Sequence, residues 1–106
     1  MKEFESLPEN NGNTETKQER KSIEFVCEYE KSQGRHAQRV KNLGYDLKSD
    51  DKQIEVKSRG SKGGFIFLNY KNIEALNREP NFWLYIVQFE KDKTSLIILG
   101  KQDILN

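Results

Sequence analysis

The chain has 106 residues, a length that suits one domain, and its net charge is +1. Although 33% of the residues are charged, the eleven aromatic side chains can build a small core. No apolar run approaches the roughly 18 residues that a membrane helix needs, so a membrane-spanning protein is excluded, and the acidic first ten residues lead us to expect no signal peptide. The single Cys27 excludes an intramolecular disulfide and a multi-cysteine zinc site, so a reducing, cytoplasmic location is expected.

The charge is distributed unevenly. Residues 31–62 hold nine basic and four acidic side chains, whereas residues 1–22 hold four basic and five acidic ones. A local basic stretch of this kind points either to a polyanionic partner or to a solvated surface.

The first element that the sequence predicts is a helix. Residues 1–21 are rich in polar residues and predict a disordered leader, so the folded domain is expected to span residues 22–106. Ser22 can serve as the N-cap of the helix and Gly34 as its stop. Between them, one apolar stripe at helical spacing consists of Ile23, Val26 and Cys27.

Three strands are predicted next. Residues 44–47 and 53–57 alternate apolar and polar side chains with a period of two, as half-buried strands do, and residues 49–52 form a plausible hairpin turn between them. A flexible, basic loop is expected at 60–64. The continuously apolar residues 65–68 then predict a third, short strand.

The second half of the chain predicts one more helix and two strands. Asn69 can cap the helix, which should end before Pro80. Residues 82–89 are apolar at nearly every position and predict a central strand covered on both faces, followed by a turn at 90–94 and a last strand at 95–99. The order helix, three strands, helix, two strands predicts an α/β (α+β) fold with one mixed central sheet flanked by helices.

Three polar side chains are expected to meet on the predicted hairpin. Side chains two residues apart share a strand face, so Glu55 and Lys57 lie together, opposite their apolar neighbours. If the apolar residues of both strands, Tyr45 and Leu47 among them, point to the core, Asp46 converges with this pair. Such a group is either a site that binds a divalent cation through carboxylate oxygens or a satisfied surface cluster.

Glu30 is a fourth candidate. It lies on the apolar stripe of the first predicted helix, where an unpaired carboxylate costs several kcal/mol and therefore needs a partner or a metal, unless the last helical turn emerges into solvent. Packed against the face of Asp46, Glu55 and Lys57, it would complete a catalytic cleft.

The order of a helix Glu, an Asp and a Glu-x-Lys is similar to that of the PD-(D/E)xK nuclease superfamily, which has a restriction-endonuclease-like fold. More narrowly, the chain resembles the domain at the C-terminus of the plant protein NO VEIN, which also occurs in bacterial restriction and defence proteins. The resemblance covers residues 23–89, and it depends on residues 26–30, 34–35, 44–47, 54–59 and 83–87. The chain departs from the pattern at Tyr45, which replaces a proline, and at Asn72, where an acidic residue is expected.

The resemblance implies a function for each candidate. Asp46 and Glu55 would ligate Mg²⁺ or Mn²⁺, with the Val56 carbonyl as a third ligand, and Lys57 would have a catalytic role. Glu30 matches the helix glutamate of the pattern. The implied activity is that of a metal-dependent nuclease domain that hydrolyses DNA phosphodiester bonds in a restriction, defence or phage-related context.

DNA is thus the expected partner, and a membrane is not. Arg35, Arg59 and Lys62 are the weaker candidates for contacts with nucleic acid. Because 106 residues leave little room for a target-reading domain, sequence specificity would need a homodimer or a partner chain. Two alternatives of the same fold stay open, namely a catalytically inactive nucleic-acid-binding module and a protein-interaction domain.

Overall fold

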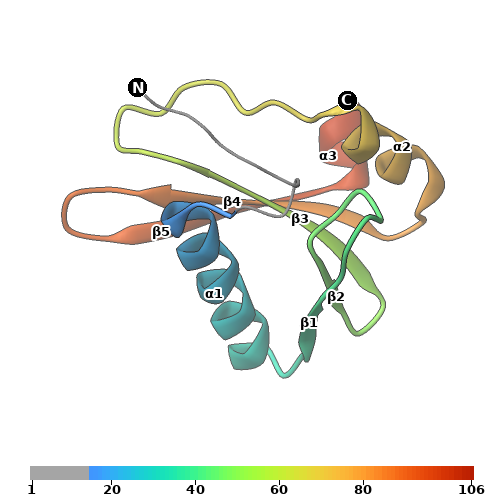
Figure 1. The fold of residues 1–106 in the computed structure, drawn as a ribbon, viewed down its shortest axis with the longest axis horizontal. Helices are drawn as coiled ribbons and strands as arrows, with labels where there is room; N and C mark the ends of the chain where they lie inside the picture. The colour runs from blue at the N-terminus through green and yellow to red at the C-terminus, as the bar shows by residue number, and fades with distance from the viewer. Residues whose placement is uncertain (1–14) are drawn as a thin grey trace.

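The computed structural model describes residues 15–106. Within these residues five strands form one sheet, in the order β1-β2-β3-β4-β5. The strands are β1 (Ala37–Arg39), β2 (Leu47–Ser49), β3 (Lys52–Arg59), β4 (Phe82–Phe89) and β5 (Thr94–Gly100). The helices are α1 (Lys17–Ser32), α2 (Tyr70–Arg78) and α3 (Lys101–Leu105). Helix α1 covers one face of the sheet, and α2 and α3 lie on the other (Figure 1).

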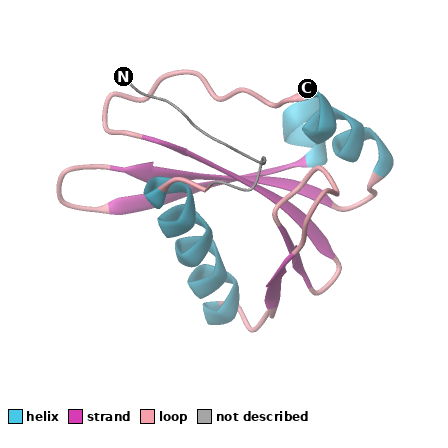
Figure 2. Ribbon diagram, in the orientation of Figure 1, coloured by secondary structure: helices cyan, strands magenta, loops and turns pink. Residues whose placement is uncertain are grey.

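The sheet is mixed. Strand β2 pairs antiparallel with both β1 and β3. Strand β4 pairs parallel with β3 and antiparallel with β5. Since a parallel pair needs a crossover connection, the chain leaves the end of β3, passes along the sheet as a long loop and returns through α2 (Figure 2). The predicted fold class, a mixed sheet flanked by helices, is confirmed.

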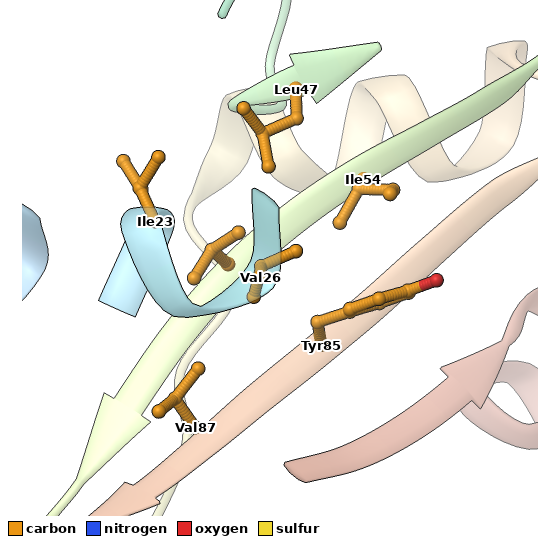
Figure 3. Packing of buried hydrophobic residues seen from close by; sticks show 7 residues of the cluster. Ile23, Val26, Leu47, Ile54, Tyr85 and Val87 are labelled. Atoms are coloured by element: carbon orange, nitrogen blue, oxygen red, sulfur yellow. The ribbon is translucent and has the colours of Figure 1, made fainter. Parts of the chain in front are cut away.

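Two apolar clusters fill the space on either side of the sheet. The larger one packs α1 against the sheet (Figure 3) and consists of Ile23, Val26, Leu47, Ile54, Val56, Tyr85 and Val87. The smaller one lies under α2 and consists of Tyr45, Ala75, Leu76 and Phe82. Successive residues of β3 point to opposite faces of the sheet, and this alternation positions the polar side chains of that strand.

Helix α1 begins earlier than the sequence predicts. It starts at Lys17, and Thr16 caps it through a reciprocal capping box with Glu19. Ser22 is not the N-cap but a buried residue inside the helix, because the capping box satisfies two backbone N–H groups where a single serine satisfies one. The folded part thus begins before residue 22, and of the predicted leader residues 1–14 lie outside the described part of the chain.

The prediction of a strand at residues 65–68 is wrong. These residues belong to the loop between β3 and α2, where the Phe65 and Phe67 side chains are 86% and 76% exposed. Parallel pairing of β4 with β3 turns the intervening segment into a crossover, so the apolar run finds no strand partner among the described residues. The third strand before α2 is instead β1, at residues that the sequence presents only as a polar stretch.

The second half of the chain follows the sequence more closely. Asn69 caps α2, which ends before Pro80, and β4 spans the predicted residues 82–89 between β3 and β5. The last strand is confirmed and is one residue longer at each end, whereas the short α3 was not predicted. Among the helices of the described residues, none has the length and apolar character needed to cross a membrane.

Candidate functional site

Asp46, Glu55 and Lys57 lie together on the α2 side of the sheet. Because Ile54 and Val56 pack in the α1 cluster, Glu55 and Lys57 project from the opposite face of β3. The Lys57 Nζ lies 3.1 Å from Glu55 Oε2. Asp46 sits just before β2, and its Oδ2 accepts a hydrogen bond of 2.9 Å from the Val56 N–H. The structure therefore brings the three predicted side chains into one group, which we call the carboxylate cluster.

Asp46 reaches the cluster by a different route from the one that strand alternation predicts. Tyr45 and Leu47 do not share a face, because Tyr45 packs under α2 and Leu47 packs under α1. Residues 42–46 form a bend rather than a strand, and the Asp46 N–H donates to the Ile54 carbonyl at 2.9 Å. The Asp46 side chain thus enters the cluster from a bend that precedes β2.

Helix α2 holds this bend in place. The Asn72 Nδ2 donates a hydrogen bond of 2.8 Å to the Gly44 carbonyl, and Asn72 also completes the capping box of α2 with Asn69. Gly44 has a φ of +87°, and a Cβ at this position would lie 2.4 Å from the Lys71 carbonyl oxygen. Asn72, the departure from the family pattern, therefore has a structural role at the edge of the carboxylate cluster.

The two carboxyl groups of the cluster strongly influence each other. Burial and the neighbouring Asp46 carboxylate raise the pKa of Glu55 to about 8, and the nearby Lys57 only partly offsets them. Burial also raises the pKa of Asp46, against the lowering effect of the Val56 N–H. Near neutral pH the pair thus retains a proton that two separate carboxylates would lose.

A divalent cation is the other way to relieve this repulsion, and the residues present fit one. Mg²⁺ is usually held by one or two carboxylates and completes its shell with water and substrate phosphates, and Asp46 and Glu55 supply two. Residues 15–106 contain no group of three or more His, Cys, Asp or Glu side chains that could hold a metal. The predicted third ligand, the Val56 carbonyl, stays a prediction.

Glu30 does not join the carboxylate cluster. It is fully buried on the opposite, α1 side of the sheet, where Arg35 donates to both of its oxygens at 2.6 and 2.8 Å. Ser49 Oγ donates at 2.8 Å and Tyr85 Oη at 2.6 Å. The expectation that Glu30 completes the cleft is wrong, because these partners satisfy its carboxylate on the far face. Its need for a partner, in contrast, is confirmed.

These partners determine the ionisation of Glu30. Burial alone would raise the pKa of the carboxyl, but hydrogen bonds from Arg35, Tyr85 and Ser49 outweigh burial and lower the pKa to about 2. Lys52 adds a fourth group, with its Nζ 3.9 Å from Glu30 and 4.3 Å from the ring centroid of Trp83. Sequence reasoning missed this network, and the signal for it is the hydroxyl group of Tyr85 in the mostly apolar strand β4.

The three candidate residues for nucleic-acid contacts lie in different places. Arg35 is committed to Glu30 on the α1 side. Arg59 shares the Lys57 face of β3, and its Nε donates to Gln88 on the neighbouring strand at 3.1 Å. Lys62 is exposed in the loop that follows β3. Of the three, Arg59 lies on the same face of the sheet as the carboxylate cluster.

A comparison with protein families decides the affiliation of the chain. The family model described as "Protein NO VEIN, C-terminal" matches residues 18–99. The chain belongs to this NO VEIN C-terminal family. The match begins within α1, where the structure places the start of the fold, and it includes the whole carboxylate cluster and the Glu30 network. No curated protein and no solved structure matches the chain.

Proposed function

We propose that this NO VEIN C-terminal domain is a Mg²⁺- or Mn²⁺-dependent nuclease domain that hydrolyses DNA phosphodiester bonds. The observation that supports it is the carboxylate cluster, in which the buried Glu55 carboxyl group, the half-buried Asp46 carboxyl group and the Lys57 ammonium group meet on one sheet face. Buried titratable groups with strongly shifted pKa values gather at functional sites, and the Glu55 pKa of about 8 is such a shift.

The proposal assigns a role to each residue. Asp46 and Glu55 hold the metal ion, with the Val56 carbonyl as a further ligand. When bound, the ion polarises the phosphoryl oxygens and lowers the pKa of a water ligand. Lys57, whose Nζ lies 3.1 Å from Glu55, supplies a positive charge for the phosphoryl group during attack. Glu30 has no part in this chemistry, since it is committed to its network on the other face.

A second candidate function is a catalytically inactive nucleic-acid-binding module. The observation that favours it is the absence of a third acidic ligand among the described residues, together with the diversion of Glu30 to Arg35. In both cases a second copy of the chain or a partner chain would supply sequence specificity, and a restriction or defence context remains part of the proposal.

A cleavage assay separates the two candidates. The full chain is incubated with supercoiled plasmid and with linear DNA, in Mg²⁺, in Mn²⁺ and in EDTA. We expect metal-dependent cleavage by the wild type and a loss of at least about 100-fold in Asp46→Ala, in line with the loss of a group that stabilises the transition state. Asp51→Ala, which removes an exposed carboxylate from the turn between β2 and β3, is the matched control and should cleave normally.

Two outcomes would contradict the nuclease proposal. Equal cleavage by the wild type and Asp46→Ala would identify a contaminating enzyme. DNA binding without cleavage under any metal would support the inactive module instead.

A further inference from the structure

The loop between β3 and α2, together with the first residue of α2, exposes large aromatic side chains to solvent. Phe65, Phe67 and Tyr70 are 86%, 76% and 76% exposed, and the rings of Phe65 and Phe67 lie 6.2 Å apart between centroids at an angle of 53°. A small domain normally buries its phenylalanines, and grouped exposed apolar side chains mark an interaction site. We call residues 60–70 the aromatic loop.

The charge around the aromatic loop has a single sign. Residues 56–73 contain four basic side chains and no acidic one, although 33% of all residues in the chain are charged. The four are Lys57, Arg59, Lys62 and Lys71. Lys57 is paired with Glu55, and the other three add positive charge beside the exposed rings. A surface that combines exposed aromatic rings with positive charge suits a ligand with flat apolar groups and negative charges, which is the chemistry of a nucleic-acid strand.

The aromatic loop also begins at the end of β3, the strand that carries Glu55 and Lys57 of the carboxylate cluster. Glu55, Lys57 and Arg59 form one row along β3, since they alternate with the residues of the α1 cluster. The row ends where the loop begins, and Arg59 Nη1 donates to the Gly64 carbonyl at 3.4 Å. Figure 1 shows the loop passing on the side of the sheet that also carries α2 and α3.

We propose that the aromatic loop binds single-stranded nucleic acid, with bases stacked on Phe65 and Phe67 and phosphates near Lys62 and Lys71. A duplex keeps the faces of its bases inside the helix, so only an unpaired strand can offer them to exposed rings. The inference rests on the proposed function and deepens it, because it names a single strand or an unpaired segment as the substrate. Such a strand would extend from the aromatic loop along the row of β3 to the carboxylate cluster.

The test measures binding and not cleavage. Fluorescence anisotropy is recorded in EDTA with a labelled thymidine oligonucleotide of about 20 residues, the matching uridine oligonucleotide and a blunt duplex of the same length. We expect both single strands to bind more tightly than the duplex, and the double variant Phe65→Ala/Phe67→Ala to bind them at least about tenfold more weakly. Phe65→Tyr/Phe67→Tyr keeps the rings and should bind like the wild type.

A matched control addresses general effects of removing surface apolar groups. Leu105→Ala alters a side chain that is 54% exposed on α3 and should leave binding unchanged. Circular dichroism and thermal melts verify that every variant folds, which is expected because the two phenylalanines contact little of the core.

Three results would overturn the inference. These are unchanged affinity of the double alanine variant, tighter binding of the duplex, and aromatic-dependent binding to phosphatidylserine vesicles without binding to the oligonucleotides. A different result would contradict the proposed function alone. If neither the wild type nor Asp46→Ala cleaves DNA but binding still depends on Phe65 and Phe67, the nuclease proposal falls and the single-strand site stands.

Discussion

At the scale of single residues, Glu30 shows which properties of a buried side chain a sequence pattern can predict and which it cannot. Its place on the apolar stripe of α1 is enough to predict that its carboxylate needs a partner. The sequence does not reveal which partner, because Arg35 follows five residues later in an irregular turn and Tyr85 lies 55 residues away on β4. Helix periodicity reports which face a side chain occupies, whereas partners across the sheet depend on the strand order, which periodicity does not encode.

Removing the Glu30 carboxylate should destabilise the domain strongly. Glu30→Ala leaves Arg35 without its anionic partner and leaves the Ser49 and Tyr85 hydroxyls without an acceptor, and breaking a buried ion pair in this way costs about 3–5 kcal/mol. Urea unfolding measures the loss. Glu28→Ala, which alters an exposed glutamate on the same helix, is the control, and equal stability of the two variants would contradict the structural role.

The same carboxylate predicts a pH dependence. The pKa of Glu30 is about 2 in the folded chain against 4.5 for the unperturbed group. A lowered pKa stabilises the fold above the unfolded value, so this contribution is complete above pH 4.5 and is lost as the pH falls towards 2. In Glu30→Gln the unfolding free energy, measured in urea, should change less over that acidic interval than in the wild type.

At the scale of secondary-structure elements, two apolar runs had different outcomes. Residues 82–89 and 65–68 both favour a strand by composition, but only the first became one. The difference lies in pairing, since β4 has β3 and β5 as neighbours, whereas the shorter run lies in the crossover that the parallel pairing of β3 and β4 requires. A strand is stabilised by its neighbours, so a single-sequence pattern predicts the candidates and the topology selects among them.

The bend before β2 offers a test of how α2 positions the carboxylate cluster. In Gly44→Ala the new Cβ would lie 2.4 Å from the Lys71 carbonyl oxygen and 2.9 Å from the Ala75 Cβ, at a φ of +87°. We expect a loss of about 2–4 kcal/mol in unfolding free energy, from backbone strain together with displacement of α2.

Gly34→Ala is the matched control for this prediction. Gly34 also has a positive φ, of +80°, but nothing lies within 4 Å of the place that an alanine Cβ would occupy. Gly34→Ala should therefore lower the unfolding free energy only by the cost of the left-handed backbone conformation, about 1–2 kcal/mol. Equal losses in the two variants, measured by denaturant unfolding, would show that contact with α2 is unimportant at Gly44.

At the scale of the whole molecule, the domain places the buried Glu30 carboxylate and the carboxylate cluster on opposite faces of one sheet. On the α1 side Glu30 is fully paired, and its lowered pKa shows that its partners stabilise the ionised form. On the α2 side burial raises the pKa of both Asp46 and Glu55, and the Asp46 carboxylate raises the pKa of Glu55 further. Burial is common to the two sites, so the partners decide which site contributes to stability and which is suited to a cation.

This difference predicts how the stability of the metal-free chain varies with pH. The pKa of Glu55 is about 8 in the folded chain against 4.5 for the unperturbed group. Between these values the folded chain binds more protons than the unfolded chain, so the contribution of Glu55 to stability falls as the pH rises from 4.5 to about 8. Glu55→Gln removes this dependence and keeps the shape of the side chain. In EDTA at a pH near the folded pKa of about 8 it should therefore be as stable as the wild type or more stable.

Thermal melts with and without Mg²⁺ complete this prediction. When the Mg²⁺ concentration is about 100 times its dissociation constant, binding should raise the unfolding free energy of the wild type by about 2.7 kcal/mol. The unfolding free energy of Glu55→Gln should not change with Mg²⁺. Val56→Asp, one residue along β3, places a charge in the α1 cluster and should unfold the domain in either condition, since the penalty of several kcal/mol approaches the whole stability of a small domain. If Glu55→Gln instead melts well below the wild type in EDTA, Glu55 serves as a structural partner of Lys57, and the carboxylate cluster is a stabilising ion pair and not a metal site.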